Sequence, residues 1–123
     1  MNKPSIPDYF IIFSIPGMLN RSRSRSYRED ILKSFTSLCR FLETNHLVTV
    51  VLLGNEPQVS DQLSVRRRDF TDEGFEFYRR TEQKWFGALD RGTPSTDTRI
   101  LERELAKLRK ERAAENEQAN NIE

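Results

Sequence analysis

The apolar residues of this 123-residue chain follow two kinds of pattern. Residues 8–15 are rich in β-branched and aromatic side chains and are followed by Pro16-Gly17, a pair that commonly ends regular structure. We expect a strand here, buried on both faces because the run lacks polar alternation. A second run, residues 47–53, is too short for an independent helix and is rich in β-branched residues, so it predicts a second strand.

The segment between these runs has the apolar spacing of one helical face. Its apolar positions are Ile31, Leu32, Phe35, Leu38, Cys39 and Leu42. This spacing predicts a helix over 27–44, with Ser26 as N-cap, Glu29 completing a capping box, and Asn45 and His46 ending the helix.

The order strand, helix, strand predicts a βαβ unit with parallel strands and a right-handed crossover. A meander, or a third strand between the two, is the open alternative. Residues 59–68 alternate weakly and predict at most a short edge strand, in which Arg66–Arg68 would discourage pairing with another sheet edge.

Two more helices follow in the C-terminal half. Thr71 is placed as an N-cap, with Asp72 and Glu73 in the first turn, where acids meet the positive end of the helix dipole. Gly92 suits the left-handed position after that helix. The residues expected to face the core are Phe75, Tyr78, Trp85, Phe86 and Leu89.

The last predicted helix begins near Thr96 and presents a narrow apolar stripe. The stripe consists of Ile100, Leu101, Leu105 and Leu108. The predicted fold class is therefore α/β: a small sheet of two to three strands with a β-α-β start and two C-terminal helices packed on it. We expect a single globular domain over 1–112 and, because the apolar period fades there, a frayed or disordered tail over 113–123.

Composition narrows the function. Twenty Lys and Arg face 19 Asp and Glu, a formal charge of +1, which argues against a chain that binds polyanions over its whole surface. One cysteine excludes an intramolecular disulfide framework, and one Cys with one His is a poor basis for a structural zinc site, so we expect no metal and no cofactor. No apolar run approaches the roughly 20 residues that span a bilayer, and the first twenty residues lack a signal-peptide core. We expect a cytoplasmic protein without membrane contact.

The sequence offers little for catalysis. His46 lies between a helix end and a predicted strand, which favours a helix-ending or packing role over acid–base chemistry. Cys39 falls on the apolar face of its helix, where a free cysteine behaves as a small hydrophobe. There is no glycine-rich phosphate loop, nucleophile elbow or paired metal-ligand motif. We therefore expect no catalytic residues and no enzyme activity.

Two basic runs are candidates for phosphate contact. Arg21–Ser26 with Arg28 could hold phosphates, although a solvated loop explains the run more plainly. If Arg66–Arg68 lay beside it, the two runs would form a patch of up to seven guanidiniums. This arrangement gives the alternative function, a small nucleic-acid-binding accessory protein; nucleic acid is not the partner that we expect.

An acidic group follows the second basic run. Its members are Asp69, Asp72, Glu73 and Glu76. Acidic side chains can imitate phosphate and plug the basic cleft of a nuclease, although the helix dipole alone explains acids in a first turn. The candidate partner-binding residues are Asp69, Asp72, Glu73, Glu76, Arg66, Arg67 and Arg68.

A resemblance covers residues 69–110. The segment Asp69-Phe70-Thr71-Asp72-Glu73-Gly74-Phe75, then Trp85, Asp90-Arg91-Gly92 and the helix Ile100–Leu108, resembles small bacterial immunity proteins encoded beside polymorphic toxins, above all those of contact-dependent growth inhibition systems. The resemblance implies a cytoplasmic antitoxin that binds one cognate toxin domain and blocks it without catalysis. It carries over no interface residues, because these vary with the toxin.

Overall fold

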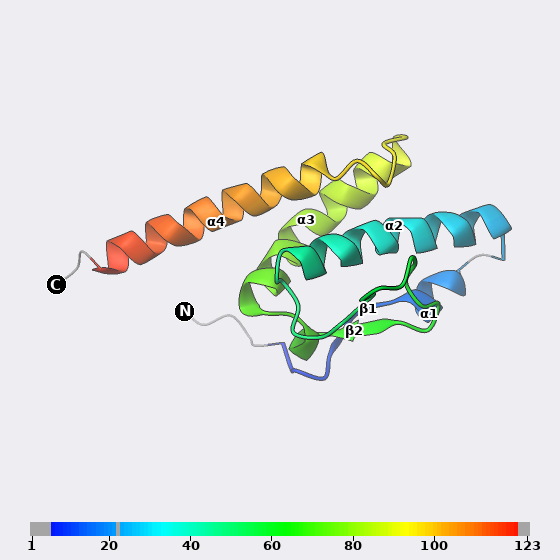
Figure 1. The fold of residues 1–123 in the computed structure, drawn as a ribbon, viewed down its shortest axis with the longest axis horizontal. Coiled ribbons are helices and arrows are strands. Elements are labelled where there is room, and N and C mark those ends of the chain that lie inside the picture. The colour runs from blue at the N-terminus through cyan, green and yellow to red at the C-terminus, as the bar shows by residue number, and fades with distance from the viewer. Residues whose placement is uncertain (1–5, 22, 121–123) are drawn as a thin grey trace. The chain divides into compact units, whose positions relative to one another are not determined.

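A computed structural model describes residues 6–21 and 23–120, so Ser22 of the Arg-Ser run and residues 121–123 of the expected tail lie outside the described residues. The elements are β1 (Ile11–Ser14), α1 (Ile15–Leu19), α2 (Arg25–Thr44), β2 (Ser64–Arg66), the 3-10 turn η1 (Arg67–Asp69), α3 (Asp72–Asp90) and α4 (Arg99–Asn120). Figure 1 shows them along the chain. The α/β class with two strands and long C-terminal helices is confirmed.

The chain divides into two compact units, residues 1–75 and 76–123. The prediction of one domain over 1–112 stays a prediction.

The sheet of the first unit is antiparallel, so the expected parallel crossover is wrong. β1 pairs with β2, and Ile11 lies opposite Arg66 while Phe13 lies opposite Val65. Two residues of β1 therefore span one step of β2, which makes Ile12 the extra residue of a β-bulge. The second strand of the sheet comes from the weakly alternating stretch 59–68 and not from the apolar run 47–53.

One face of this sheet carries the core. Phe13 and Val65 are buried, and the Phe13 ring lies 4.9 Å from the Phe35 ring of α2, centroid to centroid. The other face is not covered in the same way, because Ile11 is 44% exposed. The expectation that the first strand is buried on both faces is therefore wrong, since a two-stranded sheet with one covering helix shields only one side.

The run 47–53 forms no strand beyond a single bridge between Val48 and Phe70. Beyond it, residues 53–61, which we call the strap, run back along α2. Side chains of α2 satisfy the strap's backbone: the Glu43 carboxylate accepts from the N–H of Leu53 (2.6 Å) and Gly54 (3.3 Å), and the Thr36 hydroxyl accepts from the N–H of Val59 (3.1 Å). Backbone groups bonded in this way are not available for a strand ladder.

The observed helix boundaries agree better with those predicted from the sequence. α2 ends at Thr44 as predicted, but its N-cap is Ser24, whose hydroxyl accepts from the Tyr27 N–H; Ser26 lies inside the helix, so the expected capping box with Glu29 is wrong. Pro16-Gly17 does not end regular structure. It lies in α1, because proline suits a first helical turn and the Ser14 hydroxyl caps that turn.

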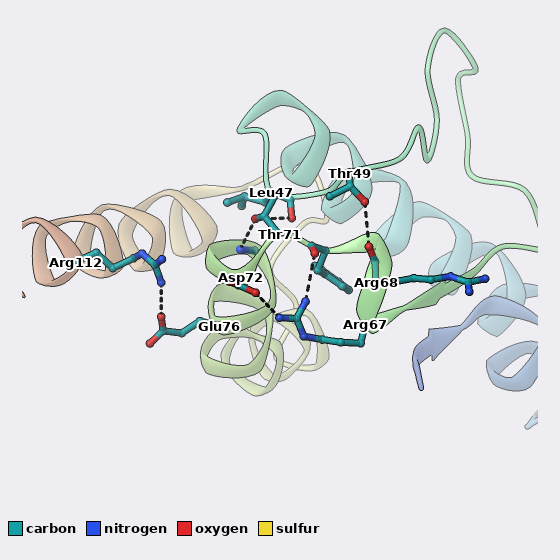
Figure 2. A network of polar contacts seen from close by, with 10 residues as sticks. Leu47, Thr49, Arg67, Arg68, Thr71, Asp72, Glu76 and Arg112 are labelled. Atoms are coloured by element: carbon teal, nitrogen blue, oxygen red, sulfur yellow. Dashed lines mark hydrogen bonds and ion pairs between the residues drawn. The ribbon is translucent and has the colours of Figure 1, made fainter. Parts of the chain in front are cut away.

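The start of α3 is fixed by the backbone of Leu47. Its carbonyl oxygen accepts from the backbone N–H of Thr71 (3.1 Å) and from the Thr71 hydroxyl (3.2 Å), and that hydroxyl accepts from the Gly74 N–H (2.9 Å), as Figure 2 shows. The prediction that Thr71 is the N-cap is confirmed. Gly74 lies so close to Leu47 that a Cβ added there would be 1.8 Å from the same carbonyl oxygen.

The second unit consists of most of α3 and of α4, which run antiparallel in Figure 1. Ion pairs join the two helices in that sense: Glu76 with Arg112, Arg80 with Glu111, and Lys84 with Glu104. The turn after α3 is the one that Gly92 predicts: its φ is +100°, and the Thr93 N–H donates to the Ala88 carbonyl. α4 begins at Arg99, three residues later than predicted.

Burial in this unit follows the expected stripe except at Ile100, which is half-buried, and adds one charged residue. Leu101, Leu105 and Leu108 are buried as predicted, and so is Trp85. Glu104 is also buried and is held between Lys84 and Lys107, at 2.8 and 3.6 Å. The hydrogen bond from Lys84 is the main reason that the pKa of Glu104 lies below its ordinary value.

We predict opposite effects for the same substitution at two glycines of α3. Gly74→Ala should destabilise the protein by about 3 kcal/mol, because the new methyl group would overlap backbone that cannot rotate away. Gly87→Ala should stabilise it by roughly 0.5–1 kcal/mol, because its added Cβ meets only the flexible end of Arg91 and alanine favours a helix. Urea unfolding of both variants measures the contrast, and equal effects would contradict it.

We also predict that His46→Gly stabilises the protein by about 1 kcal/mol. His46 has a φ of +58°, and the bonds from the His46 N–H to Glu43 and from the Leu47 N–H to Leu42 form a Schellman ending of α2. Glycine adopts this conformation without strain, whereas His46→Ala keeps the strained Cβ and should give no gain. Thermal unfolding of the two variants measures the difference.

Candidate partner-binding surface

The three arginines of the predicted site have three different roles. The Arg66 guanidinium donates to the Tyr9 carbonyl (2.6 Å), and its backbone N–H donates to the Asp69 carboxylate (2.8 Å). Asp69 is thus occupied in closing η1. Arg66 ties this turn to the residues that precede β1.

Arg67 is the arginine that holds the start of α3. Its guanidinium donates to Asp72 (2.6 Å) and to the Phe70 carbonyl (3.3 Å), and it lies 4.6 Å from the centre of the Phe75 ring. Only 19% of its side chain is exposed, whereas the Asp72 side chain is 88% exposed. A half-buried cation over an aromatic ring contributes about 0.5–1 kcal/mol, so Arg67 is mainly a structural residue.

Arg68 differs from both neighbours. Its side chain is exposed, and its guanidinium makes no hydrogen bond or ion pair within the described residues. Figure 2 shows it extending away from Arg67 and Asp72. Only the backbone of Arg68 is fixed: its N–H donates to the Asp8 carbonyl (3.0 Å), and its carbonyl accepts from the Thr49 hydroxyl (3.1 Å).

The acidic residues of the predicted site do not form an uncompensated negative surface. Asp69 and Asp72 are bonded as above, Glu76 pairs with Arg112 at 2.9 Å, and Glu73 is also engaged. Glu76 belongs to the second unit, and the other three acids belong to the first. The prediction that these seven residues bind a partner stays a prediction.

The two basic runs do not lie side by side. Arg28 pairs with Asp61 near the start of α2, whereas Arg68 accepts from Thr49, just beyond the contact between Leu47 and Leu42 that closes the helix. A helix of 20 residues is about 30 Å long, so the runs lie near opposite ends of α2. The condition for a patch of up to seven guanidiniums is therefore not met.

The sequence missed the exposed apolar residues around Arg68. The described large hydrophobic side chains with high exposure are Tyr9 (69%), Phe10 (52%), Ile11 (44%), Val50 (41%) and Val51 (77%). They come from two segments, and both segments are bonded to the turn 66–69: Arg67 N–H to Phe10 and Arg68 N–H to Asp8 on one side, Thr49 N–H to Asp69 on the other. We call these five residues with Arg68 the Arg68 surface. No signal in the pattern could have found it, because both segments read as buried strands.

Two further observations on the described chain concern metal ligands and the single cysteine. No group of three His, Cys, Asp or Glu residues within it could hold a metal ion. Burial, helped by the nearby Glu43, raises the pKa of the Cys39 thiol to about 12, so this cysteine is a poor nucleophile. No helix in the described part of the chain has the length and hydropathy needed to cross a membrane.

Comparison of the chain with protein-family models, curated proteins and solved structures found no match.

We predict that the adjacent arginines differ in their effect on stability. Arg67→Ala should lower the free energy of unfolding by about 1–2 kcal/mol, because it removes the ion pair and the aromatic contact. Arg68→Ala should change it by less than about 0.5 kcal/mol, since the lost side chain has no partner among residues 6–21 and 23–120. Chemical unfolding of the two proteins tests this, and a loss at Arg68 as large as that at Arg67 would disprove it.

Proposed function

We propose that this chain is a non-catalytic immunity protein that binds a cognate toxin domain, a nuclease, in the cytoplasm and occludes its active site or substrate groove. The toxin class comes from the resemblance of residues 69–110 to immunity proteins of contact-dependent growth inhibition. The Arg68 surface is the observation that carries protein binding. It suits a partner protein better than a small substrate or a membrane.

Composition is the first argument for this surface. Single exposed hydrophobic residues are normal on a soluble domain and need no explanation. Here five of them flank one turn of four residues, through the backbone bonds described above. Aromatic residues and arginine are the types enriched at the centres of protein interfaces.

The resemblance and the surface fit together in one further way. Thr71 caps α3, Gly74 lies against Leu47, and Gly92 ends α3. These three residues, which carry part of the resemblance, therefore stabilise the fold whichever partner is bound. Recognition of a particular toxin then belongs to residues outside that set, and the exposed segments 9–11 and 50–51 lie outside it.

Nucleic-acid binding, the alternative function, gains no support from the charges. Arg28 and Arg67 are neutralised by acids within the first unit, and the two basic runs are separated by the length of α2. Phosphate contacts that follow a nucleic-acid backbone need cations along a continuous path.

The test is co-expression with the product of the gene directly upstream. We expect this chain to protect cells that express that product and to be recovered with it in a pull-down of tagged protein. Absence of both protection and binding would overturn the proposal. Generic duplex DNA and RNA serve as the discriminating control: the proposal expects no binding, whereas affinity that falls steeply with added salt would favour the alternative.

A further inference from the structure

This inference rests on the proposed function and concerns the same surface. We propose that Arg68 is the anchor of the interface and receives a carboxylate of the partner protein. Apolar side chains next to that carboxylate then pack on the exposed segments 9–11 and 50–51. The partner's matching feature is a single Asp or Glu flanked by apolar residues.

The first step of the argument is that Arg68 is the unused cation of its run. Arg66 donates to the Tyr9 carbonyl, and Arg67 is held by Asp72 and the Phe75 ring. Arg68 has no such partner among the described residues, and its side chain is exposed. A guanidinium offers a planar fork of donors that matches a carboxylate with two parallel hydrogen bonds.

The second step is the place of Arg68 between the two apolar segments. Its N–H is bonded to Asp8, next to Tyr9, and its carbonyl is bonded to Thr49, next to Val50. A partner that covers both segments also covers the residue between them. Covering excludes water from the ion pair, and arginine shielded from water by surrounding contacts is one of the residue types enriched among interface hot spots.

The third step distinguishes two candidate ligands of Arg68, a carboxylate on a protein and a polyanion. Arg67 is already paired with Asp72, and the Arg66 guanidinium donates to the Tyr9 carbonyl, so Arg68 is the cation of this run whose charge is open to a partner. Asp8, whose backbone carbonyl accepts from the Arg68 N–H, adds an exposed acidic residue to the same segment. One available cation balances one carboxylate, whereas a row of phosphates needs several cations, so charge complementarity favours an isolated carboxylate among apolar neighbours.

The experiment measures the affinity of the full chain for the purified product of the upstream gene by calorimetry. Arg68→Gln, which keeps a polar stem but removes the charge, and Arg68→Ala should each weaken binding by about 30-fold or more. Arg23→Gln is the matched control: Arg23 is also exposed, has no partner within the described residues, and lies at the other end of α2. We expect it to change the affinity less than about twofold. Arg68→Lys should restore only part of the affinity, because an ammonium lacks the planar fork.

The outcomes separate the two proposals. If the wild-type chain binds and Arg68→Gln binds equally well, or if Arg23→Gln weakens binding as much, the Arg68 anchor is wrong while the proposed function stands. If the wild-type chain does not bind, the proposed function fails and the anchor fails with it.

Circular dichroism of each variant checks that it is folded. Val51→Ser, at the most exposed hydrophobic side chain, gives a second measure, and a loss of affinity there is expected as well.

Discussion

The hydrogen bonds accepted by the carbonyl oxygen of Leu47 are the interaction on which the first unit depends. It accepts two hydrogen bonds from Thr71, and the third residue after Thr71 must be glycine because any side chain would occupy the same space. The N–H of the same residue donates to Leu42, so Leu47 joins the end of α2 to the start of α3. Two residues further on, Thr49 is bonded to Asp69 and Arg68. The position of the candidate surface therefore follows from where Leu47 lies.

The helices and the first strand were predictable from the sequence, and the strand that pairs with it was not. The spacing of the apolar residues in α2 and the caps at Thr71 and Gly92 are local signals, and local hydrogen bonds realise them. The run 47–53 carries an equally strong apolar signal, yet its neighbours decide its conformation. Within this run the Thr49 N–H is bonded to Asp69 and the Leu53 N–H to Glu43, and β1 pairs instead with the weaker stretch Ser64–Arg66. Long-range pairing of this kind leaves no mark in the pattern of a single segment.

Prediction from the sequence meets the same limit at the candidate site. The sequence identifies Arg66–Arg68 as a basic run, but three identical side chains give no reason to distinguish one from another. The structure distinguishes them by what each can reach: a carbonyl for Arg66, a carboxylate and an aromatic ring for Arg67, and nothing within the described residues for Arg68. Consecutive residues in a short turn point in different directions, so a charge run indicates solvent exposure without indicating which charge is available.

The extra residue in β1 has a consequence for how the strand tolerates a change in its length. In a regular strand, Ile11 and Phe13 would share a face; because Ile12 is inserted opposite a single step of β2, Phe13 enters the core while Ile11 remains outside. One apolar strand thus serves both the core and the surface. Deletion of the codon for Ile12 would make Ile11 and Phe13 neighbours, and neighbouring residues of a regular strand point to opposite faces, so Phe13 would stay in the core and Ile11 on the surface. This strand should therefore tolerate loss of Ile12 better than loss of Phe13, whose buried ring packs against Phe35.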